Sequence, residues 1–172
     1  MTGLDALLAG REERALVQKS LLVGRGACAV VQASLNIPGL PKTARGDAEA
    51  LLFAARALSK SLGRAPGVSA ALTNGAGTAL YMVYSSLSPR KLKLSAVEIE
   101  ESADWTRVLD IDVITEDGAV SRGGLALPPR RCLLCGEDAK ICARAGTHSI
   151  QDLRAESARL LSRSLRASAS AR

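Results

Sequence analysis

The sequence predicts an α+β fold, a small mixed sheet with helices packed over one face. Two observations lead to this class: several segments have the apolar periodicity of a helix, and several short runs are β-branched or alternate apolar and polar residues, as strands do. A length of 172 residues suffices for one domain with a buried core. We therefore assign residues 1–166 to a single domain, which includes a Cys-rich module at 127–149, and residues 167–172 to a frayed tail.

The first part of the chain is predicted to form two helices with a strand between them. Leucines at partial helical spacing predict a helix over 4–22. A short run of β-branched and apolar residues predicts a buried strand over 27–35, in which Cys28 would be a core residue. An apolar stripe then predicts a second helix, with Asp47 as its N-cap and Gly63 as its C-cap.

A tight turn and another helix are predicted in the middle of the chain. Thr, Asn and Gly residues over 73–78 indicate a hairpin turn that leads into a strand over 79–85. Such a turn could instead hold a phosphate on its backbone N–H groups, although no helix follows it as that interpretation requires. Ser88 and the proline after it predict a helix start, and an apolar stripe continues to Glu101, with a strand over 97–100 as the alternative.

Alternation of apolar and acidic residues predicts a strand over 109–114. The two-residue period of a strand places Asp110 and Asp112 on the same face. An acidic turn with a glycine then leads into a short partner strand over 119–122. After the irregular Cys-rich module, Ser149 is expected to cap a final amphipathic helix.

Charge and composition narrow the classes of function. A net charge of +6 indicates an anionic partner. Aromatic residues make up only 2% of the chain, which argues against nucleic acid as that partner, because single-strand binding usually adds base stacking. No run approaches the roughly 18 apolar residues of a membrane span, and the first residues lack the pattern of a signal peptide. We expect a cytoplasmic protein without a membrane partner, in which clustered cysteines bind metal or stay reduced.

The paired aspartates Asp110 and Asp112 are the first candidate site. Like charges this close raise the pKa of one carboxyl group unless a cation lies between them. Mg2+ takes carboxylate and phosphate oxygens, so the pair fits a magnesium-dependent phosphoryl or nucleotidyl transfer, with both residues as catalytic and metal-binding candidates. A solvated strand face is the alternative. A third carboxylate would come from Glu98, Glu100 or Glu101.

Several arginines are candidates for binding an anionic substrate. Two prolines restrain the backbone before Arg130 and Arg131, and Arg11 and Arg14 share one face of the first helix. Each of these pairs could instead be solvated or paired with a neighbouring glutamate. The full candidate set is Arg11, Arg14, Arg107, Arg122, Arg130 and Arg131.

The second candidate site is a cluster of three cysteines and the only histidine. Cys132 and Cys135 have the spacing of a zinc knuckle, and Cys142 and His148 could complete a Cys3His tetrahedron. Four protein ligands close the coordination shell, so such a zinc ion would be structural. The alternative is three reduced thiols packed against the last helix, with His148 at the surface.

Several of these motifs together resemble one family. The segments that carry the resemblance are Asp110-Ile111-Asp112-Val113, Ser121-Arg122, Leu127-Pro128-Pro129-Arg130-Arg131-Cys132-Leu133-Leu134-Cys135, Cys142-Ala143-Arg144 and Thr147-His148, with Gly10-Arg11-Glu12-Glu13-Arg14 near the start. They are similar to the apo-citrate lyase phosphoribosyl-dephospho-CoA transferases, also called holo-citrate lyase acyl carrier protein synthases, over nearly the whole chain. Residues 102–107 replace the family's His-Pro-Leu-Gly-Arg-like segment and keep only its arginine.

The resemblance implies a nucleotidyltransferase-like fold and a defined reaction. The donor would be 2'-(5''-triphosphoribosyl)-3'-dephospho-CoA, the acceptor a serine of the citrate lyase acyl carrier protein (the gamma subunit), and pyrophosphate would leave. Asp110 and Asp112 would hold Mg2+ against the triphosphate. The candidate arginines between residues 107 and 131 would stabilise the departing pyrophosphate, and those of the first helix would hold donor phosphates. The basic surface would attract an acidic carrier.

Two functions of other classes are alternatives to this enzyme. The first is a zinc-containing basic module that binds nucleic acid or protein without catalysis, and it predicts salt-sensitive retention on nucleic acid that does not depend on Asp110. The second is a structural subunit of a lyase assembly with degenerate aspartates, which predicts stable co-purification without turnover.

Overall fold

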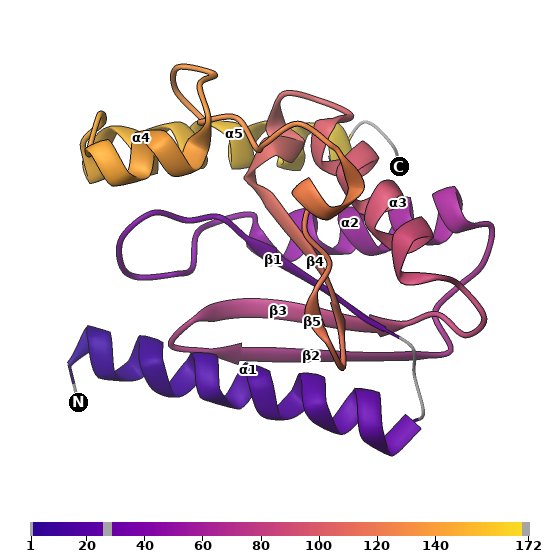
Figure 1. Cartoon of the computed structure of the whole chain (residues 1–172). Coiled ribbons are helices and arrows are strands. Elements are labelled where there is room, and N and C mark those ends of the chain that lie inside the picture. Colours follow the sequence, from indigo (N-terminus) through magenta and orange to yellow (C-terminus); the bar gives the residue numbers. More distant parts are fainter. Residues whose placement is uncertain (1, 26–28, 170–172) are drawn as a thin grey trace.

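The computed structural model describes residues 2–25 and 29–169 and shows an α+β fold (Figure 1). Five strands form one sheet in the order β2-β3-β1-β4-β5. The helices and strands are α1 (Gly3–Arg25), β1 (Val30–Leu35), α2 (Asp47–Leu62), β2 (Val68–Asn74), β3 (Gly77–Val83), α3 (Pro89–Glu101), β4 (Leu109–Thr115), β5 (Gly118–Ala119), α4 (Ala139–Ala145) and α5 (Ile150–Ala169), with 3-10 turns η1 (Trp105–Val108) and η2 (Gly123–Leu125). The predicted core position of Cys28 lies outside the described residues.

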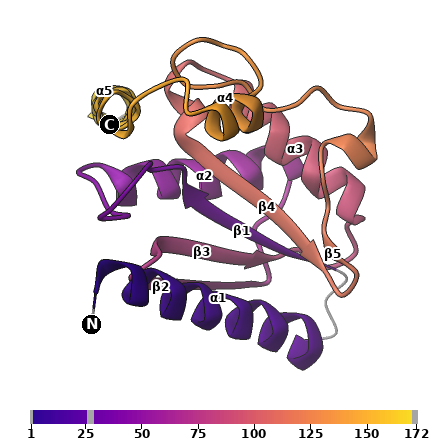
Figure 2. The ribbon, with the colours of Figure 1, turned by 60° about the vertical axis from the view of Figure 1, so that its left-hand side comes forward.

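Helices cover both faces of the sheet, which corrects the prediction that they pack over one (Figures 1 and 2). Helices α2, α3 and α5 enclose the main core on one face. Helix α1 lies along the other face, where Leu22 and Tyr81 belong to a second apolar cluster. The leucine pattern of α1 is a poor guide to this packing, because three of its leucines are exposed: Leu4, Leu8 and Leu16. None of the described helices is both long and apolar enough to span a bilayer.

All strand pairs of the described sheet are antiparallel, so the prediction of a mixed sheet is wrong. Helix α2 connects β1 to β2, helix α3 connects β3 to β4, and in each case the two strands run in the same direction. A strand of opposite direction lies between them each time, since β3 separates β1 from β2 and β1 separates β3 from β4. Strands joined by a helical crossover are often parallel neighbours, but in this sheet the interleaved strand order makes every neighbouring pair antiparallel.

Local signals predicted several element boundaries correctly. Ser88 Oγ accepts a hydrogen bond from a backbone N–H in the first turn of α3, and Gly63 adopts a left-handed conformation (φ 68°) at the end of α2. The N-cap of α2 is Gly46 rather than Asp47, whose side chain bonds the next backbone N–H. Two elements were not predicted, because β2 is a largely exposed strand at the sheet edge and α4 has only seven residues.

Helix α1 docks against the turn between β2 and β3, which is the hairpin turn predicted over 73–78. Asn74 Nδ2 donates a hydrogen bond of 3.0 Å to Gly10 O on α1. A Cβ atom on Gly75 would collide with the backbone oxygen of Ala6, so only glycine permits this approach. Close backbone contact therefore holds the first half of α1 on the sheet.

Replacing Gly75 by alanine is expected to lower the free energy of unfolding by about 2 kcal/mol, because the added methyl group forces α1 away from the turn. Gly123→Ala is the matched control, since a Cβ atom there would meet nothing within 4 Å. Urea unfolding followed by circular dichroism measures both variants. Equal stability of the two variants would contradict a tight approach of α1.

Candidate active site

Asp110 and Asp112 lie on the face of β4 that is turned away from α2 and α3. Their apolar neighbours along the strand belong to the main core, so the strand alternation directs both carboxylates to the opposite side. On β1, Ser34 pairs with Asp110 and Gln32 pairs with Asp112. Each aspartate side chain is 42% exposed. The structure therefore brings the predicted pair together on an accessible part of the sheet.

The two carboxyl groups have different electrostatic environments. Partial burial, followed by the charge of Asp110, raises the pKa of Asp112 from its ordinary value of 3.8 to about 6. Lys93 Nζ, 3.9 Å from Asp112 Oδ1, offsets only part of this effect. Asp110 has a closer partner, because Arg130 Nη1 donates to its Oδ1 at 2.7 Å. A cation shared by the pair would relieve the repulsion at Asp112.

Side chains close the outer edge of β4 beside the pair. Strand β5 pairs only with the last two residues of β4, so the earlier residues have no strand partner on that side within the described chain. There Glu100 Oε1 accepts the Ile111 N–H at 2.8 Å, and Lys93 Nζ donates to Ile111 O at 2.8 Å. Arg130 donates to Leu109 O. These bonds provide partners for backbone groups of β4 that have no neighbouring strand to pair with.

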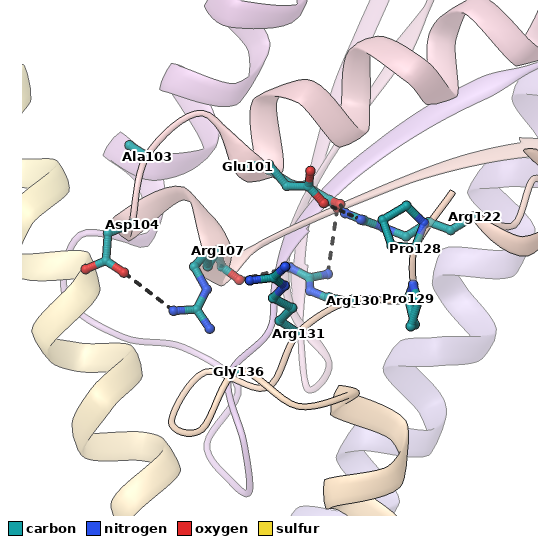
Figure 3. A pocket seen from close by; sticks show the side chains of 11 residues that line it. Glu101, Ala103, Asp104, Arg107, Arg122, Pro128, Pro129, Arg130, Arg131 and Gly136 are labelled. Atoms are coloured by element: carbon teal, nitrogen blue, oxygen red, sulfur yellow. Dashed lines mark hydrogen bonds and ion pairs between the residues drawn. The ribbon is translucent and has the colours of Figure 1, made fainter. Parts of the chain in front are cut away.

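A cavity of about 400 Å3 opens beside this edge, and arginines are prominent in its lining (Figure 3). Arg122 forms a 2.6 Å ion pair with Glu100, and Arg107 lies 3.5 Å from Asp104. Arg131 also lines the cavity and forms no ion pair within the described part of the chain. The cavity thus gathers four of the predicted substrate-binding residues, Arg107, Arg122, Arg130 and Arg131, but three of them already face carboxylates.

Among the three glutamates considered as a third carboxylate, Glu100 is the one that interacts with the pair. It is 4% exposed, it contributes to the raised pKa of Asp112, and its Oε1 lies 3.7 Å from Arg130 Nη1. Both of its oxygens accept hydrogen bonds from the protein itself, so it supports the strand. Glu98 is exposed on α3, and Glu101 forms a 2.5 Å ion pair with an arginine of the cavity.

Residues 102–107, where the sequence differs from the motif of the family that it resembles, line one side of the cavity. Trp105 is 8% exposed and packs edge-on against Phe53 of α2, with ring centroids 4.7 Å apart. Arg107 Nη2 donates to the backbone oxygen of Cys132. The arginine that this segment retains therefore links η1 to the Cys-rich module.

The three cysteines and the histidine of the second candidate site come together. Their ligand atoms all lie within 4.8 Å of one another. Cys135 Sγ is 3.3 Å from Cys142 Sγ, which is 3.9 Å from His148 Nε2. A loop carries Cys132 and Cys135, α4 carries Cys142, and His148 lies just before α5. This Cys3His cluster could hold a metal ion.

Helix α1 brings Arg14 towards the aspartate pair. Arg14 Nη2 donates to Ala76 O at 2.7 Å, and its guanidinium attracts the charge of Asp110. Arg11 lies one turn earlier, is exposed and repels Arg14. The predicted arginines therefore form two groups, one on α1 and one around the cavity, and Asp110 interacts with both.

Sequence reasoning missed three cations of this region, Lys93, Lys42 and Arg154. The buried Lys93 has one weak signal, since it directly follows Leu92 on the flank of the apolar stripe of α3. Lys42 and Arg154 both hold the loop after β1, where Lys42 Nζ donates to Ile37 O and Arg154 Nη1 to Pro38 O, each at 2.7 Å. No local pattern marks these two, because they meet only in the folded chain.

The raised pKa of Asp112 predicts a stabilising substitution. Between about pH 4 and pH 6 the folded state binds more protons than the unfolded state, so the aspartate lowers stability as the pH rises. Asp112→Asn should raise the free energy of unfolding at pH 7.5 by up to about 1 kcal/mol, because solvent screening limits the gain. At pH 4.5 the gain in the free energy of unfolding should be smaller. Asp110→Asn is the contrast, because it weakens the ion pair with Arg130 and should cost stability. Urea unfolding at both pH values tests this, and equal losses in the two variants would contradict it.

Comparison with known proteins identifies the family of this chain. A protein-family model described as apo-citrate lyase phosphoribosyl-dephospho-CoA transferase matches residues 2–164. A probable enzyme of that name from Streptococcus pyogenes is 31% identical over 163 residues, which cover 92% of this chain and 84% of that protein. The enzyme from Escherichia coli O1:K1 is 36% identical over 154 residues, which cover 87% and 83%. The chain therefore belongs to the apo-citrate lyase phosphoribosyl-dephospho-CoA transferase family.

Proposed function

We propose that this protein transfers the phosphoribosyl-dephospho-CoA group from 2'-(5''-triphosphoribosyl)-3'-dephospho-CoA to a serine of the citrate lyase acyl carrier protein, with release of pyrophosphate. The family match over residues 2–164 supports this enzyme class and does not favour a module without catalysis. The structural observation that carries the proposal is the pair Asp110 and Asp112, which shares one accessible face of β4 and has Arg14 and Arg130 beside it.

The aspartate pair fits a magnesium ion. Carboxylate oxygens are the ligands that Mg2+ prefers, and two like charges on one strand face favour a cation between them. Within the described residues, Oδ2 of Asp110 and Oδ2 of Asp112 accept no hydrogen bond, so each can face a ligand. When bound, the ion would neutralise charge on the triphosphate of the donor.

The cations of the chain would bind the donor and stabilise the leaving group. The carrier serine oxygen forms a bond to the phosphorus nearest the ribose, the bond to pyrophosphate breaks, and the hydroxyl proton is lost to solvent. Negative charge then develops on the departing pyrophosphate. Arg131 would bind another anionic group of the donor, because no carboxylate pairs with it in the described structure, whereas Arg130 orients Asp110 through their 2.7 Å hydrogen bond.

We also propose that Cys132, Cys135, Cys142 and His148 hold a structural zinc ion. Thiolate sulfur and imidazole nitrogen are its usual ligands, and four protein ligands leave no open position for chemistry. The Cys132 N–H donates to Glu137 O at 2.6 Å, which closes the loop between the first two ligands and α4. A reducing cytoplasm would keep these thiols free for the metal, and we place the enzyme there, with a fold of nucleotidyltransferase type.

The transferase proposal predicts a mass gain on the acceptor. Incubation with the triphosphoribosyl donor, Mg2+ and the apo carrier should yield a carrier heavier by the prosthetic group, as measured by intact mass spectrometry. Asp110→Asn and Asp112→Asn should each lower the rate at least about 100-fold while the circular dichroism spectrum is retained. The control is Asp117→Asn, in the exposed β4–β5 turn, which should transfer at the normal rate. A wild-type protein that adds no mass would contradict the proposal.

The zinc proposal predicts about one zinc ion per chain in protein purified with reduced thiols, as measured by inductively coupled plasma mass spectrometry. Cys135→Ser should lose most of this metal, because three protein ligands hold zinc less tightly than four. Chelation should lower the melting temperature of the wild type and have little effect on the variant. Wild-type protein with metal well below one ion per chain would refute the site.

A further inference from the structure

Four cationic side chains gather at one end of the sheet. Arg11 and Arg14 come from α1, Lys42 from the loop after β1, and Arg154 from α5. Burial first, and then the charges of the three arginines, lower the pKa of Lys42. Among residues 2–25 and 29–169, none of the four forms an ion pair with a carboxylate. This cationic cluster (Arg11, Arg14, Lys42 and Arg154) therefore has like charges as near neighbours, and no carboxylate of the described residues pairs with it directly.

Backbone contacts hold the cluster in place. Lys42 Nζ donates to Ile37 O at 2.7 Å, and Arg154 Nη1 donates to Pro38 O at 2.7 Å. A Cβ atom on Gly77 would lie 2.5 Å from Lys42 O, so the loop also packs closely against the β2–β3 turn. Figures 1 and 2 show this loop, that turn and the start of α1 at the same end of the sheet. Lysine has three donors and arginine five, so both side chains keep N–H groups for a ligand.

Within the part of the chain that the structure describes, two buried polar atoms of this region lack hydrogen-bond partners: Arg14 Nε and the hydroxyl oxygen of Tyr81. Tyr81 is 0% exposed, lies on the α1 side of the sheet, and interacts electrostatically with Arg14. Buried polar groups nearly always have a partner, so this pair indicates a place where an oxygen-rich ligand or its water would be favourable. The unpaired Nε belongs to Arg14, one of the four cations, so this observation points to the same location.

The cationic cluster differs from the cavity on the other side of Asp110. Arg107, Arg122 and Arg130 of the cavity each face a carboxylate, which lowers the net positive charge that a ligand would meet there. The cluster has four positive charges without such pairs, and Arg14 connects it electrostatically to Asp110. A chain of phosphates that extends from the aspartate pair would therefore be stabilised more strongly on the cluster side.

We propose that Arg11, Arg14, Lys42 and Arg154 form the seat of a polyphosphate, and that Lys42 and Arg154 are substrate-binding residues of this enzyme. The ligand class is a triphosphate-bearing nucleotide derivative, and this assignment rests on the proposed function. The aspartate pair then lies at one end of the phosphate chain, and the cationic cluster binds the remainder.

Calorimetric titration of the full chain with inorganic tripolyphosphate, with and without Mg2+, tests the seat. Lys42→Gln and Arg154→Gln should each weaken binding about tenfold, the value of roughly one charge-assisted contact, and salt should weaken wild-type binding steeply. Arg163→Gln is the matched control, because it removes an arginine of α5 that pairs with Asp104 instead, and it should bind as the wild type does. Lys42→Arg keeps the positive charge and should bind tripolyphosphate as the wild type does.

The outcomes distinguish this inference from the transferase proposal. If the wild type transfers the group but both Gln variants bind tripolyphosphate as tightly as Arg163→Gln, the seat is refuted and the transferase stands. If tripolyphosphate binding depends on Lys42 and Arg154 while no transfer occurs, the seat is supported and the transferase fails. Melting temperatures are measured for each variant. If one of the two Gln variants unfolds, the other carries the test; where Arg154→Gln folds, Arg154→Lys should bind more tightly than it does.

Discussion

Strand β4 carries the aspartate pair, yet the first part of its outer edge has no neighbouring strand in the described structure. A buried N–H or C=O group without a partner costs about 1–3 kcal/mol, so this edge needs other partners. Glu100, Lys93 and Arg130 supply them through hydrogen bonds to the backbone of the strand. The same three charges pair with one another or with the aspartates, which makes their burial tolerable. One network of hydrogen bonds and ion pairs therefore both supports the strand and orients the two aspartates.

The Cys-rich module is part of that network. Its first backbone segment presents Arg130 to β4, and the Ala139 N–H at the start of α4 donates to Arg130 O at 2.8 Å. From the other side, Arg107 reaches the backbone of Cys132. The metal-ligand cluster thus lies directly behind the arginines of the cavity. A role for the module in positioning the arginines of the cavity follows from this arrangement.

The charges around Asp110 are distributed unevenly. Around the cavity, carboxylates accompany most arginines, which favours a rigid network over free binding capacity. On the α1 side, the cations bond mainly to backbone oxygens and keep their charge available. The net charge of +6 adds a long-range attraction for an anionic substrate or an acidic carrier. This difference in pairing suggests two roles: the arginines that pair with carboxylates orient the aspartates, and the cations on the α1 side would bind phosphate.

Local patterns of the sequence determined the helix start at Ser88, the helix end at Gly63 and the strand with Asp110 and Asp112 on one face. These features depend on residues only a few positions apart, so period and capping chemistry predict them. The family resemblance pointed to the same aspartates and cysteines. The tertiary structure alone decided the antiparallel strand order, the face that α1 covers, the partners of each arginine and the meeting of Lys42 with Arg154. Each of those features depends on which distant segments pack together, and packing of the whole chain, rather than any local pattern, sets that choice.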